Sequence, residues 1–246
     1  MKIKIFALIV LIISISSNSC LAVRKQQVIS KPPELLYANG IKQIKEHSKN
    51  TKSIEIFKNL MVSYPFSNYS LKGQIVSAYI HYKNREYQDA YTAAQNYINN
   101  YPGGQYSLYA LYLMALASFH NAIINSTDIS MLSKAKLELE YLYNKDQNGI
   151  YINDIKQRLK IINQLTANQI IEIGLFYFKK QKYQATINRM QDIVNQYPDS
   201  KNVTTALQYI IISYKNLGFN DRAEVYTNIL YKRYTKKNNN MQNNNN

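Results

Sequence analysis

Cysteine is nearly absent from this chain, since Cys20 is the only one among 246 residues. A single cysteine excludes an intramolecular disulfide, and a structural zinc cluster would need several more ligands than the sequence offers. Glycine and proline are also scarce, with seven and five residues. Few breaks are therefore expected inside helices, and the fold has to be held by packing. The length suits one sizeable domain, or one solenoid of about five helix pairs.

Acidic residues are few, with 15 against 30 basic ones, which gives a formal net charge of +15. Such an excess ordinarily raises nucleic acid or anionic lipid as a partner, because phosphate contacts require dense Lys and Arg. Here the basic residues are scattered along the whole chain instead of forming one stripe. The sequence therefore favours a solvated basic surface, and we expect no nucleic-acid partner.

Sequence motifs of catalysis are missing as well. There is no glycine-rich phosphate loop, nucleophile elbow or paired-carboxylate signature. His47, His81 and His120 stand far apart in the sequence and lack a partnered acid or cysteine. We expect a protein that is not an enzyme, with no catalytic residues, no cofactor and no metal.

What the chain does contain begins with a secretion signal. Lys2 and Lys4 precede an apolar run over 5–15, and small polar residues then lead to Cys20. The apolar run is shorter than the roughly 20 residues that span a bilayer, which disfavours a permanent transmembrane anchor. We expect residues 1–19 to be a signal peptide.

Cys20 follows Ser19 at the place where the lipobox of bacterial lipoproteins has its acylated cysteine. Ser17 departs from the usual aliphatic residue, and Cys20-Leu21-Ala22 can also be read as a small-x-small site for ordinary signal peptidase. The sequence favours lipidation of Cys20, and the resemblance to lipoproteins implies outer-membrane sorting, because Leu21 follows the cysteine. We expect 20–33 to be an extended tether and 236–246, which is basic and then nearly all Asn, to be disordered.

A Tyr-Pro dipeptide recurs along the rest of the chain, beginning at Tyr64, Tyr101 and Tyr197, and Tyr234 lacks only the proline. The steps from Tyr64 to Tyr101 and from Tyr197 to Tyr234 are both 37 residues. This step is close to the tetratricopeptide period of about 34 residues, in which each repeat is a helical hairpin. The sequence therefore predicts an all-α, right-handed superhelix of about five tetratricopeptide (TPR) helix pairs over residues 34–235.

Small residues fall where the two helices of such a hairpin must cross. Counting back from Pro198 places Gly174 and Thr186 at the crossing, with Met190 at the bulky position. In the second repeat Ala78 and Ala90 take the small positions. In the first repeat Ser53 and Phe57 fit, but Gly40 lies one residue early, which predicts an insertion near 48–50. A long connection is expected over 121–132, and an added helix over 153–165.

The lipoprotein signal, the Pro-Pro tether and four further segments together resemble the BamD family of outer membrane protein assembly factors. These segments are Glu34-Leu35-Leu36-Tyr37-Ala38, the turn Tyr64-Pro65-Phe66-Ser67-Asn68-Tyr69-Ser70, Ala78-Tyr79 with Tyr82-Lys83-Asn84, and Ile187-Asn188-Arg189. The resemblance implies a TPR-repeat lipoprotein adaptor anchored at the periplasmic face of the outer membrane. It implies that the N-terminal repeats capture the C-terminal signal strand of unfolded outer-membrane β-barrel proteins. It also implies that the C-terminal repeats dock the periplasmic domains of BamA, beside other Bam complex subunits.

The resemblance also nominates contact residues. Tyr64, Pro65, Phe66 and Tyr69 are expected to contact substrate, and Arg189 to make a charged contact with substrate or partner. Tyr64 and Pro65 also punctuate the repeat, and most other tyrosines at helical spacing are expected to pack the core. Two other functions stay open: a periplasmic scaffold for peptidoglycan or envelope enzymes, and an enzyme on a helical-repeat frame. The second would need polar residues converging in one cleft.

Overall fold

The structure, a computed structural model, describes residues 31–46 and 51–243, and within them every regular element is a helix. The side chains of Glu46 and of 234–243 lie outside the description, as do residues 1–30, which hold Cys20 and most of the expected tether. The helices are α2 (Pro33–Glu46), α3 (Thr51–Ser63), α4 (Asn68–Lys83), α5 (Tyr87–Asn100), α6 (Ser107–Ile124), α7 (Ile129–Lys145), α8 (Ile152–Lys179), α9 (Tyr183–Gln196), α10 (Val203–Asn216) and α11 (Asn220–Asn243).

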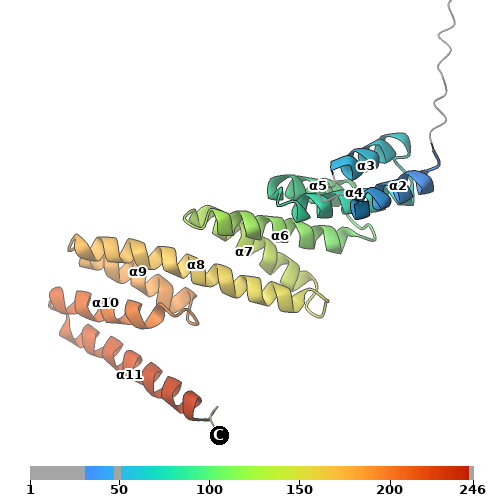
Figure 1. Ribbon diagram of the computed structural model, residues 1–246. Helices are drawn as coiled ribbons and strands as arrows, with labels where there is room; N and C mark the ends of the chain where they lie inside the picture. The colour runs from blue at the N-terminus through green and yellow to red at the C-terminus, as the bar shows by residue number, and fades with distance from the viewer. Residues whose placement is uncertain (1–30, 47–50, 244–246) are drawn as a thin grey trace, which may run out of the picture.

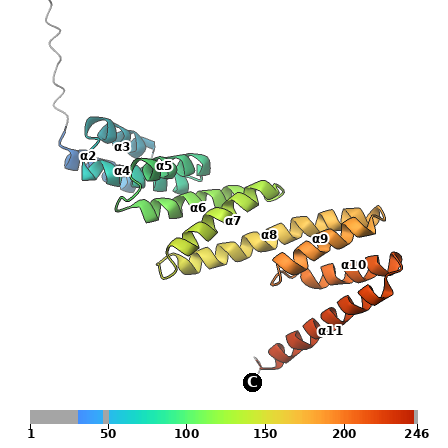
Figure 2. The same cartoon turned by 180° about the vertical axis from the view of Figure 1, so that it is seen from behind.

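These helices pack as five sequential pairs, which confirms the predicted all-α fold. The pairs follow one another in an elongated array, with α2 and α11 at opposite ends (Figures 1 and 2). The first helices α2, α4, α6, α8 and α10 contact one another in order. In the described chain the second helices approach each other only through side chains, as in the hydrogen bonds from the Tyr91 hydroxyl on α5 to Glu138 on α7, at 2.9 Å, and from Gln191 on α9 to the Tyr226 hydroxyl on α11, at 2.6 Å. The first helices therefore form one continuous face, as stacked hairpins require.

The predicted crossing residues hold the helices of a pair close together. A Cβ atom added at Gly174 would lie 2.6 Å from Met190 Cε and 3.2 Å from its Sδ. Ala78, Ala90 and Thr186 are fully buried. The repeat register predicted from the Tyr-Pro turns is therefore confirmed in the second and fourth pairs.

In the first pair the crossing is made by Gly40 and Phe57. The Phe57 ring is fully buried, and a Cβ at Gly40 would come within 2.5 Å of it. On the other side, a Cβ at Gly73 of the next repeat would lie 3.1 Å from the same ring. Gly40 thus serves as the crossing residue in spite of its offset, and the expected insertion near 48–50 falls outside the described residues.

The predicted long connection over 121–132 is wrong, because α6 continues to Ile124 and α7 begins at Ile129. Ala122 is fully buried in the core, so packing extends α6 beyond His120. Asp128 starts α7 by accepting hydrogen bonds from the backbone N–H groups of Ser130, at 2.8 Å, and Met131. By length and composition α6 is apolar enough to cross a membrane, but half of it is buried inside the protein.

The added helix expected over 153–165 is not separate, since α8 runs unbroken for 28 residues. No glycine or proline occurs in it before Gly174. Ile155 and Ile162 in its first half belong to the core shared with α6 and α7. Ala167 and Ile171 in its second half belong to the core shared with α9 and α10. One helix therefore joins the third pair to the fourth.

The last helix also departs from expectation. The sequence predicts disorder from residue 236, whereas α11 continues as helix to Asn243. No glycine or proline interrupts residues 219–246, and asparagine costs a helix only several tenths of a kcal/mol per residue. Before α11, Gly218 at φ of 81° ends α10 at the predicted Leu217-Gly218 stop.

Candidate functional site

Tyrosines recur three residues apart on successive first helices. Tyr79 and Tyr82 lie on α4, and Tyr109 and Tyr112 lie on α6. Residues three apart share one face of a helix. Because α4, α6 and α8 are neighbours, Tyr151 at the start of α8 joins the same surface. We call the surface formed by these five residues the inner tyrosine face.

The rings of the inner tyrosine face contact each other across repeats. Tyr151 stacks on Tyr112, with centroids 3.9 Å apart, and lies 6.2 Å from Tyr109. Burial raises the pKa of Tyr109 to about 12, so its hydroxyl keeps its proton at neutral pH. Tyr79 is 40% exposed. The surface therefore offers aromatic rings and neutral hydroxyls to a bound molecule.

A charged pair lies beside these rings. Asp154 accepts hydrogen bonds from the Tyr112 hydroxyl at 2.9 Å and from Arg158 Nε at 2.5 Å. Burial acts to raise the pKa of Asp154, but the hydrogen bonds from Arg158 and Tyr112 outweigh it and lower the pKa. The Arg158 guanidinium carbon lies 4.7 Å from the centroid of the buried Phe119 ring. Both groups are therefore charged at neutral pH.

His120 closes this cluster on the side of α4 and α5. Its Nε2 is 3.0 Å from the Tyr82 hydroxyl, and its ring stacks on Tyr87 with centroids 4.9 Å apart. Burial, followed by the nearby charge of Arg158, lowers the pKa of His120, so the ring is neutral at pH 7. We call Tyr82, Tyr112, His120, Asp154 and Arg158 the Arg158 cluster.

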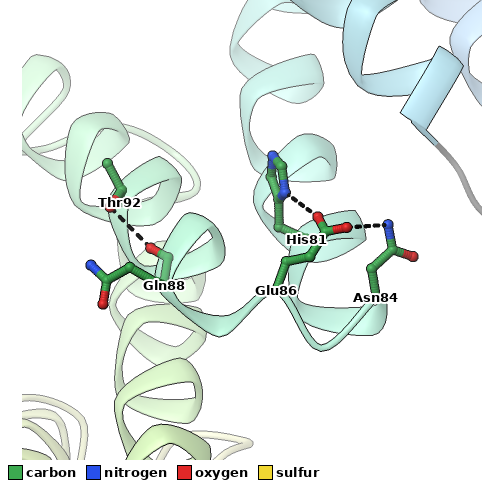
Figure 3. A network of polar contacts seen from close by, with 5 residues as sticks. All are labelled: His81, Asn84, Glu86, Gln88 and Thr92. Carbon is green, nitrogen blue, oxygen red and sulfur yellow. Dashed lines mark hydrogen bonds and ion pairs between the residues drawn. The ribbon is translucent and has the colours of Figure 1, made fainter.

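A second polar network lies at the turn between α4 and α5 (Figure 3). His81 Nδ1 is 2.7 Å from Glu86 Oε2, and Asn84 Nδ2 donates to Glu86 Oε1 at 3.5 Å. The prediction that no histidine has a partnered acid is therefore wrong for His81, which pairs with Glu86. This pair bridges a turn in which Arg85 has a φ of 64°. Asp89 brings a third possible metal ligand, with the three ligand atoms within 4.8 Å of one another.

The predicted turn residues lie at the other end of α4. Phe66 is 98% exposed, whereas Tyr64 is half-buried and its hydroxyl donates to the Lys31 carbonyl at 3.3 Å. Tyr69 is half-buried against Tyr37, with ring centroids 5.7 Å apart. Pro65 lies exposed in the turn beside Phe66.

The predicted residues do not gather in one place. The first turn of α4 and Tyr82 in its last turn are separated by about 20 Å at 1.5 Å per residue, so Phe66 is remote from the Arg158 cluster. Arg189 lies on α9, which contacts α8 and α10 but not α4. It is about half exposed and pairs with Asp192 on its own helix at 3.1 Å. The structure thus shows three separate surfaces.

The sequence expectation is that most helical tyrosines pack the core, and it does not single out the Arg158 cluster, although Tyr79 and Tyr82 lie in a segment that resembles the BamD family. The signal that would have found them is the repeated spacing of three on alternate helices, at 79 and 82, 109 and 112, and 151 and 154. Their convergence depends on which helices are first in their pairs. That order becomes visible only once α7 and α8 are correctly bounded.

An open groove of about 1300 Å³ lies in the C-terminal half, between α7, α8 and the turn from α9 to α10. Its lining includes Tyr143, Leu159, Ile161 and the turn residues Tyr197 and Pro198. Asn163 also lines this groove, although its Oδ1 atom is buried and has no hydrogen-bond partner among the described residues. The third Tyr-Pro turn therefore borders a groove with both apolar and polar side chains in its lining.

Stacked helical hairpins with an aromatic inner face and a separate groove define a helical-repeat protein. Comparison with known families makes this more specific. The profile of the outer membrane lipoprotein family YfiO matches residues 30–229. The chain belongs to this family of non-catalytic outer membrane lipoproteins.

Relatives carry the name outer membrane protein assembly factor BamD. The protein of Rickettsia prowazekii is 27% identical over 220 residues, which cover 89% of this chain and 87% of the relative. The protein of Caulobacter vibrioides is 25% identical over 194 residues, 79% of this chain and 63% of the relative. The protein of Neisseria meningitidis serogroup A is 26% identical over 196 residues, 75% of this chain and 73% of the relative. The resemblance to the BamD family is confirmed.

Proposed function

We propose that this protein is an adaptor of the β-barrel assembly machinery, which captures unfolded outer-membrane proteins and brings them to the barrel-forming subunit BamA. The inner tyrosine face is the observation that carries this proposal. It runs across three repeats, from Tyr79 on α4 to Tyr151 at the start of α8. A client strand in extended form would cross several repeats, because an extended chain spans about 3.3 Å per residue.

The chemistry of the face suits the last strand of a barrel protein. Such a strand has aromatic residues at alternate positions, whose rings can pack against Tyr79, Tyr109 and Tyr151 in offset or tilted geometry. Stacked hairpins commonly use the face of their first helices for extended peptides. We propose that the exposed Phe66 and its neighbours Tyr64, Pro65 and Tyr69 add apolar contacts at the opposite end of α4.

We propose that the C-terminal repeats dock the periplasmic domains of BamA. The groove beside Tyr197 and Pro198 supports this role, since it is open and has apolar side chains such as Leu159 and Ile161 in its lining. On α11 the exposed Val225 and Ile229 lie four residues apart on one face, which leaves an apolar surface on this helix for a partner. Arg189 would supply a charged contact on this half.

Affinity for a client peptide tests the role of the inner face. We expect Tyr79→Ala and Phe66→Ala each to weaken binding of a fluorescent peptide, copied from the last strand of a barrel protein, by about fivefold to tenfold. The measurement is a fluorescence anisotropy titration. Tyr141→Ala is the matched control, because Tyr141 is 55% exposed but lies on α7, a second helix.

Equal affinity of the wild type and Tyr79→Ala would contradict client binding at the inner face. If only Phe66→Ala binds the peptide with unchanged affinity, the turn at Tyr64-Pro65-Phe66 ends the first repeat but does not contact the client. Circular dichroism of each variant shows whether the helices remain intact. Because Tyr79 and Phe66 are both exposed, neither change removes a fully buried side chain.

We propose that acylated Cys20 anchors the protein to the outer membrane. Cys20→Ala is expected to move the protein from the membrane fraction to the soluble periplasm, because several acyl chains at about 0.8 kcal/mol per buried CH₂ hold a protein durably. Fractionation with immunoblotting measures the change. A variant that stays with the membrane, together with a wild type that takes up no labelled fatty acid, would contradict lipidation at this residue.

A further inference from the structure

Arg158 has hydrogen-bond donors that the protein leaves unused. Its Nε donates to Asp154, and within the described residues its side chain makes no other hydrogen bond. A guanidinium carries five N–H donors. Only 18% of the Arg158 side chain is exposed, but neither Nη atom is among the buried side-chain atoms of the described residues that lack a hydrogen-bond partner, so both Nη groups reach the surface. A ligand can therefore reach donors that the protein does not use, on a guanidinium held in place by Asp154 and Phe119.

A second positive charge lies near the cluster. Asp154 pairs with Arg158, while Arg85 acts on His120 from the loop after α4. His120 itself is neutral at pH 7 because burial lowers its pKa. A carboxylate bound at Arg158 would therefore be favoured by the charge of Arg158 and, more weakly, by that of Arg85.

The groups around this charge fit the end of a peptide chain. The Phe119 ring lies under the guanidinium at 4.7 Å and holds it in place. Tyr82 and Tyr112 flank the guanidinium closely enough for their hydroxyls to interact with it electrostatically. A carboxylate can receive two parallel hydrogen bonds from the two Nη groups of an arginine, which is the strongest neutral-pH contact available to such a ligand.

We propose that the Arg158 cluster binds the free C-terminal carboxylate of the client chain. This inference rests on the proposed function and specifies how the inner tyrosine face places its ligand. The carboxylate sits at the Nη groups of Arg158, and the aromatic side chains of the last strand lie along Tyr109 and Tyr151. The site therefore recognises the C-terminal carboxylate of a chain, and an internal strand of the same composition, which lacks this group, binds less well.

Two peptides of one sequence test this inference, one with a free C-terminal carboxylate and one with a C-terminal amide. In anisotropy titrations against the full-length protein, we expect the amide to bind about tenfold more weakly than the acid. Arg158→Met removes the charge and keeps the length, so it is expected to bind both peptides equally. Arg222→Met on α11 is the matched control and retains the difference.

Removing the charge of Asp154 should increase the preference for the acid peptide, whereas Arg158→Met should abolish it. A gain in preference cannot result from misfolding, so this variant keeps the inference testable if Arg158→Met fails to fold. Asp154→Asn can still accept from the Tyr112 hydroxyl, but it frees Arg158 from its ion pair and raises the net charge. We expect a larger preference for the acid, by about threefold. A third peptide, a free acid whose internal Asp and Glu residues are replaced by amides, should bind as the parent acid does.

The outcomes separate this inference from the proposed function. Acid and amide peptides that bind the wild type equally well would overturn carboxylate recognition and leave client binding intact. Loss of affinity only on replacing the internal acids would overturn it as well, since the carboxylate would then be a side chain. If neither peptide binds, the proposed function fails, and this inference fails with it.

Discussion

Replacing Gly174 with leucine is expected to lower the free energy of unfolding by about 2–4 kcal/mol. Even a single Cβ at this position would lie 2.6 Å from Met190 Cε and 3.4 Å from Arg189 Cβ. Met190 is fully buried, so its side chain cannot swing out into solvent to make room. A branched side chain has to push α8 and α9 apart.

Chemical denaturation followed by circular dichroism measures this effect. Gly103→Leu is the matched control, because Gly103 lies in the turn before α6 with no atom within 4 Å of an added Cβ and without a positive φ. The control should unfold at nearly the wild-type denaturant concentration. If Gly174→Leu unfolds there too, close approach of α8 and α9 is not required for the fourth pair.

Phe57→Ala is expected to cost about 3–5 kcal/mol in free energy of unfolding. The ring is fully buried and fills the space between Gly40 on α2 and Gly73 on α4. Because both neighbours are glycines, neither has a side chain that can relax into the cavity, and the cost falls at the upper end of the range for such truncations. The first pair, at the open end of the array, should unfold first.

Hydrogen exchange of the α2 and α3 amides, together with a denaturation curve, checks this result. Phe66→Ala makes the same chemical change at a side chain that is 98% exposed, and its expected effect on stability is within about 0.5 kcal/mol. Equal curves for the two variants would show that the Phe57 ring contributes nothing to the joint between the first two repeats.

The sequence predicted the repeats wherever small residues had to meet, because a glycine such as Gly174 has a fixed role at a helix crossing. The prediction failed where a helix continues because no residue ends it. Nothing between 152 and 173 breaks a helix, yet whether a helix continues is decided by packing on both halves, which a local pattern does not contain. The length of α6 was missed for the same reason, since Ala122 is held by tertiary contacts.

The candidate site was harder to predict than the fold. Tyr82, His120 and Arg158 come from α4, α6 and α8, and they meet because these helices stack side by side. Their separations in sequence follow no motif. The turn Tyr64-Pro65-Phe66 was found readily because its residues are contiguous in the sequence. A contiguous motif of this kind can mark the end of a repeat as well as form a binding site.

Because α8 is unbroken, it connects the N-terminal and C-terminal halves of this protein rigidly. A helix of 28 residues is about 40 Å long and resists bending, so the surface proposed to hold the client and the surface proposed to meet BamA turn together. Each residue of a helix adds about 100° of rotation, so the number of residues in α8 sets the angle between its contacts with α6 and α7 and its contacts with α9 and α10. A one-residue insertion near the buried Thr166 would rotate one of these two sets away from its partners, so we expect it to separate the two halves.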